Sequence, residues 1–135
     1  MSTQYTTVTE EGKVPNTYMT GEVSYKKQTS EIHPENTTIK EVSFEPSARS
    51  NWHSNVSLQM LIATGGTGYY QERGSEIRML QKDEVVTILP GIEHWYGATP
   101  FNKFSYIAII TEIDKGFGTW LEKVTDEEYF SFQRA

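Results

Sequence analysis

Turn signals divide this chain into short, evenly spaced segments. From Gly65 to Gly91 they return about every ten residues, which is typical of a β-sandwich or barrel and not of strands that alternate with helices. The runs between them are rich in β-branched and aromatic residues, which favour strands. No helical periodicity interrupts them. The pattern therefore predicts an all-β domain.

The expected strands are the apolar or alternating runs between these turns. They are residues 19–25, 37–45, 58–64, 69–72, 76–80, 84–89 and 103–113. Residues 26–36 are expected to be a polar connection, because Pro34 argues against a central strand, and Gly65–Gly68 a turn. Run 103–113 is the longest and is apolar on both faces, which favours a core on one side and a second chain on the other. We therefore expect a homodimer.

The two ends of the chain have different signals. Residues 1–17 are polar and predict either a mobile arm or an added edge strand, ahead of a single domain over residues 18–135. Thr125, with Glu128 three residues later, matches the capping box and predicts a short C-terminal helix.

Composition excludes several classes of protein. The 135 residues suffice for one domain. The absence of cysteine excludes disulfides and thiolate ligands and suits the cytoplasm, where we expect the protein. There is no targeting signal at the first residues and no apolar run long enough to span a membrane. A net charge of −6 with scattered basic residues argues against nucleic acid as a partner.

Two segments far apart in the chain carry candidate metal ligands. In a regular strand, His53, Asn55 and Gln59 share one face, and His94 follows the Pro90-Gly91 turn much later. Nitrogen and oxygen donors that converge from distant strands suit a metal site better than a hydrophobic core. The alternative is structural: amides cap turns, and paired histidines bond each other or a buried water.

The same residues resemble the motifs of a known family, the cupins. The first cupin motif, a glycine, His-x-His, an acidic or amide residue and a glycine, corresponds to Ser47, His53, Asn55, Gln59 and Gly66. The second, a glycine, Pro-x-Gly and a histidine, corresponds to Asp83, Leu89-Pro90-Gly91 and His94. Residues 51–53, 94–95, 97–100 and 122–129 are similar to the small bacterial cupins that include the manganese-dependent hydroxynitrile lyases.

This resemblance implies a double-stranded β-helix, a dimeric or tetrameric assembly and a divalent metal at the mouth of the barrel. The implied ligands are His53, Asn55, Gln59 and His94, and the implied pocket positions are Lys40, Tyr106 and Ile110. Two positions depart from the family pattern, because Asn55 and Tyr96 stand where histidines are usual. Fewer imidazoles imply weaker affinity for an ion that is a stronger Lewis acid. Mn²⁺, Fe²⁺ and Zn²⁺ all remain possible.

Several side chains near this site have two interpretations each. Asn55 either coordinates the ion or holds a water on it. Tyr96 shares a face with His94, where it is either a catalytic proton donor or an aromatic wall of the pocket. Lys40 stabilises an anion if it points inwards and is a surface charge if it points outwards. Trp52 and Trp95 are expected to pack on the opposite face, and His33 to lie in a solvent-exposed loop.

The sequence therefore supports three hypotheses on function. The first is a metal-dependent enzyme, lyase-like or oxygenase-like, that acts on a small oxygenated organic molecule. The second is a barrel that binds or senses a small ligand and whose metal site is weakened or lost. The third is a dimeric accessory protein without a ligand. A serine or cysteine nucleophile is not among them, since there is no cysteine and no G-x-S-x-G motif.

Overall fold

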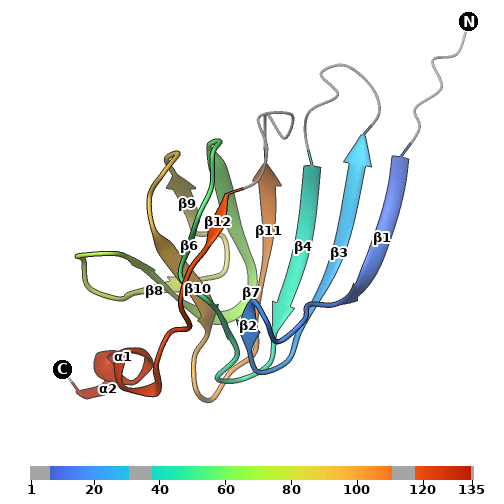
Figure 1. The fold of residues 1–135 in the computed structure, drawn as a ribbon. Helices are drawn as coiled ribbons and strands as arrows, with labels where there is room; N and C mark the ends of the chain where they lie inside the picture. The colour runs from blue at the N-terminus through green and yellow to red at the C-terminus, as the bar shows by residue number, and fades with distance from the viewer. Residues whose placement is uncertain (1–6, 31–37, 111–117, 135) are drawn as a thin grey trace, which may run out of the picture.

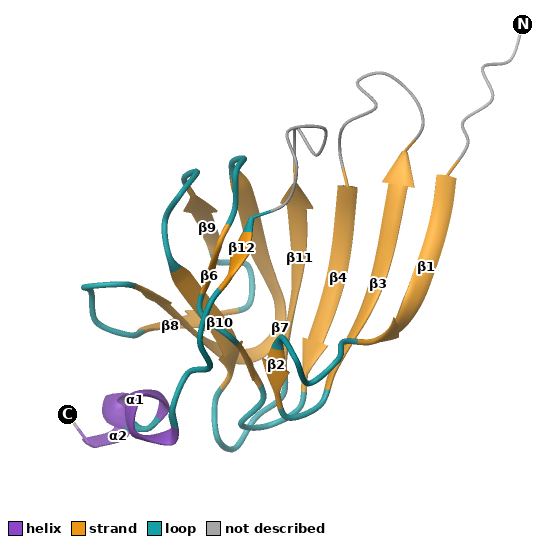
Figure 2. Ribbon diagram, in the orientation of Figure 1, coloured by secondary structure: helices purple, strands orange, loops and turns teal. Residues whose placement is uncertain are grey.

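The structure is a computed structural model that describes residues 7–30, 38–110 and 118–134. These residues form a curled antiparallel sheet with two short helices at the C-terminus (Figures 1 and 2). The all-β prediction and the short C-terminal helix are confirmed. The elements are β1 Thr7–Lys13, β2 Met19–Thr20, β3 Val23–Ser30, β4 Thr38–Phe44, β5 Arg49–Ser50, β6 His53–Ser54, β7 Gln59–Glu72, β8 Arg78–Gln81, β9 Val85–Ile88, β10 His94–Ala98, β11 Phe104–Ile110, β12 Thr119–Trp120, α1 Asp126–Tyr129 and α2 Ser131–Arg134.

Two layers face each other, and β7 belongs to both. In the first layer, the order is β1-β3-β4-β11-β7, with β9 also paired to β7. In the second, β7 pairs with β10, which continues to β5 and β2, while β6 and β12 extend it. Figure 1 shows β1, β3, β4 and β11 side by side, with the shorter strands beyond β7. The N-terminal strand β1 forms the edge of the first layer by pairing with β3.

The glycine-rich stretch after Thr64 is not a turn, so that prediction was wrong. Strand β7 continues through Gly65–Gly68 and changes its partners there, from β11 to β8 and β10. Gly66 has φ +71° and lies so close to β11 that a Cβ would sit 1.8 Å from the carbonyl oxygen of Lys103. A Cβ on Gly68 would sit 2.5 Å from the Phe104 ring. These glycines therefore permit a crossing of strands, which the sequence pattern alone did not distinguish from a turn.

Three further expectations about strands were wrong. The run expected over 19–25 is split at Gly21, which has φ +84°, and β3 continues to Ser30, into the expected polar connection. The longest strand among the described residues is β7, with 14 residues, whereas β11 has 7. Residues 111–113 of the expected long strand, and His33 and Pro34, lie outside the described residues.

The apolar side chains form two clusters. One fills the space between the layers and includes Phe44, Leu61, Ile88, Phe104 and Tyr106. The other lies outside the second layer. It comprises Trp52, Tyr69, Ile77, Trp95, Val124 and Tyr129. Trp52 and Trp95 are therefore packing residues, as predicted, on the face opposite to the two histidines.

The C-terminal helix α1 closes this second cluster. Thr125 and Glu128 make the predicted capping box, with the Glu128 N–H donating to the Thr125 hydroxyl at 3.1 Å. The Tyr129 hydroxyl donates to the carbonyl of Ala98, and the Arg49 guanidinium lies 4.3 Å from the Tyr129 ring centre. No helix in the described parts of the chain is long and apolar enough to cross a membrane.

Candidate functional site

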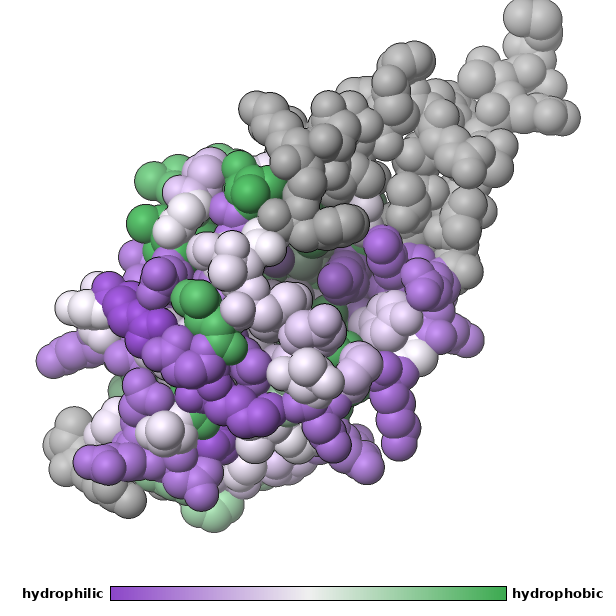
Figure 3. All heavy atoms as spheres, in the orientation of Figure 1, coloured by the Kyte–Doolittle hydropathy of each residue, from purple (hydrophilic) through white to green (hydrophobic). Residues whose placement is uncertain are grey.

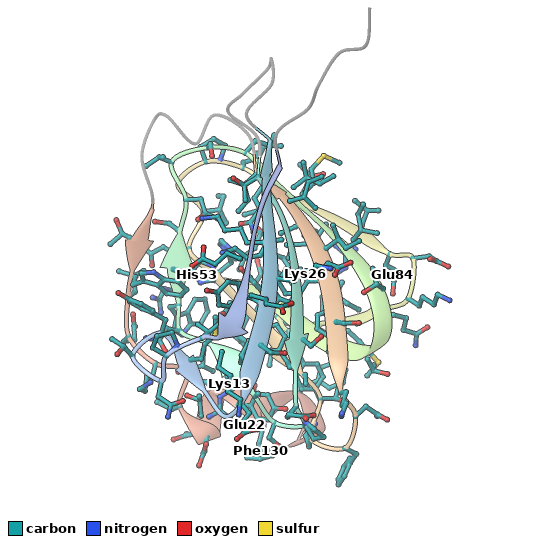
Figure 4. All side chains as sticks on the ribbon, turned by 90° about the vertical axis from the view of Figure 1, so that its right-hand side faces the viewer. Lys13, Glu22, Lys26, His53, Glu84 and Phe130 are labelled. Atoms are coloured by element: carbon teal, nitrogen blue, oxygen red, sulfur yellow. The ribbon has the colours of Figure 1, made fainter. Side chains whose placement is uncertain are left out.

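The two histidines of the motifs lie directly opposite each other on neighbouring strands. His53 of β6 pairs with His94 of β10, and their ring centres are 4.2 Å apart. Opposed residues of an antiparallel pair point to the same face. That face is the interior, where His53 is 4% and His94 0% exposed. Figure 4 labels His53 in the space between the two layers.

Backbone carbonyls determine which ring nitrogens of these histidines carry hydrogen. The Nδ1 atom of His53 lies 2.9 Å from the carbonyl oxygen of Asn51, and that of His94 lies 2.8 Å from the carbonyl oxygen of Ile92. Because a carbonyl only accepts, both Nδ1 atoms are donors and both Nε2 atoms carry a lone pair. Burial lowers the pKa of His53 to about 3 and also lowers that of His94. Both rings are therefore neutral at pH 7.

A chain of polar side chains continues from the histidines. The side-chain N–H of Asn55 donates to the Gln59 carbonyl oxygen, and Gln59 lies near enough to Tyr96 to influence the pKa of its hydroxyl. Tyr106 packs against Tyr96, with ring centres 5.0 Å apart. Burial raises the pKa of Tyr96, so its phenol stays protonated. Its ring centre lies 5.2 Å from that of His53, which places the phenol beside the two imidazoles.

This region is not the regular strand that the alternation predicted. Strand β6 ends at Ser54 and β7 begins at Gln59, with a bend between them. Asn55 is half-buried, whereas Gln59 is 3% exposed. The two amides meet through their hydrogen bond instead of through a shared strand face.

A cavity of about 210 Å³ opens beside His53. Asn55, Lys40 and Ile110 line it, together with Lys27 and Trp120. The pocket positions Lys40 and Ile110 thus lie in one cavity with the histidine. Tyr106 does not line the cavity. It is buried in the core with its ring centre 5.0 Å from that of Tyr96.

Two residues that line this cavity were not predicted from the sequence. The Trp120 ring centre lies 4.7 Å from that of His53 and 4.7 Å from that of Tyr18. Trp120 belongs to a two-residue strand, for which no alternating pattern exists. Lys27 was assigned to a polar connection but belongs to β3. The sequence pattern did not show that pairing with β4 extends that strand.

The residues present fit the divalent ion that the resemblance implies. The Nε2 atom of His94 is buried and has no hydrogen-bond partner, and an unprotonated imidazole nitrogen there is a ready ligand. Among the described residues, no three or more His, Cys, Asp or Glu side chains lie together so that they could hold a metal ion. The candidate oxygen ligands from the motif are the amides of Gln59 and Asn55, and such a donor set suits Mn²⁺, Fe²⁺ or Zn²⁺ with open positions.

No protein-family model matches the chain. A curated relative, (R)-mandelonitrile lyase of Granulicella tundricola, is 36% identical over 118 residues, which are 87% of this chain and 90% of the relative.

Solved structures are similar as well. A cupin-like protein of Thermotoga maritima superposes with a TM-score of 0.85 at 42% identity, over 90% of this chain and 93% of the other. A cupin-2 domain of Rhodospirillum rubrum superposes with a TM-score of 0.70 at 12% identity, over 100% and 88% of the two chains, and shows the fold alone. The curled sheet, the motif residues and these relatives agree that the chain is a cupin and resembles the mandelonitrile lyase-like members of that family.

Proposed function

We propose that this protein is a metal-dependent enzyme that acts on a small oxygenated organic molecule by lyase-like chemistry. The observation that carries the proposal is the pair of neutral imidazoles whose Nε2 atoms are both free of hydrogen. The lyase relative supports the reaction class. The cavity volume of about 210 Å³ supports a small substrate, since pockets for drug-sized ligands are larger.

His53 and His94 would hold the ion through Nε2, and Gln59 would add its amide oxygen. When bound, such an ion supplies Lewis-acid polarisation of a hydroxyl or carbonyl. Asn55 donates to that same Gln59 oxygen, so it orients the amide and leaves the oxygen's second lone pair available. Asn55 is thus a positioning residue in this proposal.

Tyr96 would manage the proton. Its ring centre lies 5.2 Å from that of His53 and 5.6 Å from that of His94, so its hydroxyl is close to the proposed metal site. Because burial raises its pKa, it acts as a hydrogen-bond donor or acid and not as a base at neutral pH. The apolar ring of Trp120 would cover one side of the substrate.

Metal analysis of protein purified without chelators tests the proposal. Wild type should contain close to one divalent ion per chain, and His94→Ala should lose it. His33→Ala, which removes the chain's remaining histidine, is the control and should keep it. Asn55→His should tighten binding by adding a third imidazole. Equal metal content in wild type and His94→Ala would refute the site.

The second candidate is a cavity that binds a small ligand without a metal. The observation that favours it is the hydrogen bond of Asn55 to Gln59, which pairs the two amides with each other where many cupins have an additional imidazole. A metal-free wild type that gains an ion only as Asn55→His would support this candidate.

The homodimer stays a prediction. The outer side of the first layer offers the surface for it, because Ile107 of β11 pairs with Ile62 and Ile109 pairs with Ile39. Ile39 is 42% and Val85 45% exposed, and Val85 pairs with Ile62. Light scattering on the purified protein measures the mass, and a monomeric mass at micromolar concentration would contradict the prediction.

A further inference from the structure

Two lysines face the cavity from neighbouring strands. Lys27 of β3 and Lys40 of β4 are directly opposed in the antiparallel register, and both line the cavity beside His53. Figure 4 shows Lys26 and His53 on opposite sides of β3. Because successive residues of a strand alternate between faces, Lys27 points to the side of His53.

The strand pattern marks Lys40 as an exception on an inward face. In β4 the inward residues are Thr38, Val42 and Phe44, all buried, while Ile39 and Glu41 on the outer face are exposed. Lys40 shares the inward face and is half-buried. If this position only served packing, an apolar side chain like those of Val42 and Phe44 would suit it better. Instead, the fold holds an ammonium group in a partly desolvated place.

This arrangement has an electrostatic cost. Like charges directly opposite each other on a sheet are destabilising, and burial together with the charge of Lys27 lowers the pKa of Lys40. The charge of Glu10, which is paired with Lys27 on β1, opposes this shift in part, although Glu10 also accepts a hydrogen bond from the Tyr25 hydroxyl at 3.2 Å and does not line the cavity. Among the lining residues that the structure describes, the two lysines carry the only formal charges. A bound anion would offset the repulsion between them.

The rest of the cavity wall indicates what kind of anion fits. Trp120, Ile110 and Val56 supply apolar surface, and Asn55 and Ser57 supply polar groups. Figure 3 shows hydrophobic residues only as separate patches in a mostly hydrophilic surface on the face that carries β12. A small organic molecule with one anionic end suits such a wall better than an inorganic ion, which would leave the apolar part unused.

We infer that the cavity takes a small organic carboxylate, with Lys40 and Lys27 binding its carboxylate while its hydroxyl or carbonyl faces His53, the histidine that lines the cavity. The inference rests on the proposed function, because it places the reacting oxygen of the ligand at the proposed metal site. Lysines bind carboxylates as point charges and impose little geometry. The charge of the ligand is therefore selected more strictly than its shape.

Paired ligands of equal size test the inference. The probes are lactate with lactamide and pyruvate with pyruvamide, titrated into metal-free and metal-loaded protein and followed by calorimetry or NMR. In each pair the amide has nearly the size of the acid, but a neutral NH₂ group replaces the charged carboxylate oxygen. Wild type should bind at least one carboxylate about tenfold more tightly than its amide, the size of effect that one charge-assisted hydrogen bond supplies.

Matched variants separate the cavity lysines from general surface charge. Lys40→Met should abolish the preference for the carboxylate, Lys27→Met should reduce it, and Lys40→Arg should restore most of it. Lys26→Met, the neighbour on the outer face, should leave it unchanged. Far-ultraviolet circular dichroism establishes that each variant is folded. Were Lys40→Met unfolded, Lys27→Met and Lys40→Arg would carry the test.

Two results would overturn the inference: no preference for the carboxylate in either pair, or an equal loss in Lys26→Met and Lys27→Met. The two proposals fail separately. A preference that depends on Lys40 in metal-free protein, combined with no metal in wild type, would support the carboxylate site and refute the metal-dependent function. A metal that depends on His94, combined with equal binding of acids and amides, would do the reverse.

Discussion

Replacing Arg49 by methionine tests what attaches the C-terminal segment to the barrel. Arg49 is 4% exposed. Its Nη2 donates to the Val124 carbonyl at 3.0 Å and to the Asp126 carboxylate at 2.7 Å, and its Nη1 donates to the Ser47 carbonyl at 3.3 Å. The segment that it holds follows Trp120, so this contact also supports the wall of the cavity.

The expected magnitude follows from which partner is buried. Arg49→Met keeps an unbranched apolar stem but leaves the Val124 carbonyl without its donor, and such a loss costs about 1–3 kcal/mol per buried group. With the weaker bond to Ser47 and the contact with Tyr129, the total should be about 2–4 kcal/mol. The side chain of Asp126 is 84% exposed, so Asp126→Asn should cost no more than about 1 kcal/mol.

Urea unfolding at pH 7 measures the free energy of unfolding of both variants. The values are compared provided that the slope of this free energy against urea concentration is unchanged. Arg49→Met should lower the midpoint clearly, and Asp126→Asn should lower it only slightly. The reasoning would be refuted if the two substitutions were equally costly, because the ion pair and not the backbone carbonyls would then dominate. A loss below about 1 kcal/mol in Arg49→Met would also refute it.

Two further predictions concern the strand crossing and the histidine pair. Gly66→Ala should cost about 3 kcal/mol or more in the same urea assay, since the Cβ would strike the Lys103 carbonyl; Gly74→Ala, which has φ +90° but nothing within 4 Å, is the control and should cost about 1 kcal/mol. Metal-free protein should lose stability as the pH falls from about 6.5 towards 3, because the folded state holds His53 neutral while the unfolded chain takes up a proton. The loss attributable to His53 should reach about 2.5 kcal/mol at pH 4.5 and be absent in His53→Gln, and an identical pH dependence in the two proteins would contradict it.

Local sequence signals predicted the elements whose cause is local. The capping box placed the start of α1, because Thr125 and Glu128 satisfy each other's backbone groups within one turn. Alternation placed β4 and put Val42 and Phe44 on the same face, which the structure shows to be the inward one. The glycines of β7 were misjudged because the same residue type permits a turn and a close crossing. Only the position of β11 distinguishes the two.

The site divides in the same way. The histidines, the two amides and Tyr96 could be selected from residue type and motif, and the structure joins them through β6, β7 and β10. Lys27 and Trp120 could not be selected, because each acquires its place through pairing with a strand distant in the chain.

The sequence by itself determined the all-β class, the C-terminal helix and the residue types available for a metal. Only the tertiary structure decided that β7 is one continuous strand, that Trp120 packs against His53 and that Lys27 and Lys40 lie side by side on the wall of the cavity. The physical reason is that local patterning sets the face of each residue within its own strand, whereas the neighbour across the strand depends on register. Register is settled by the packing of the whole barrel.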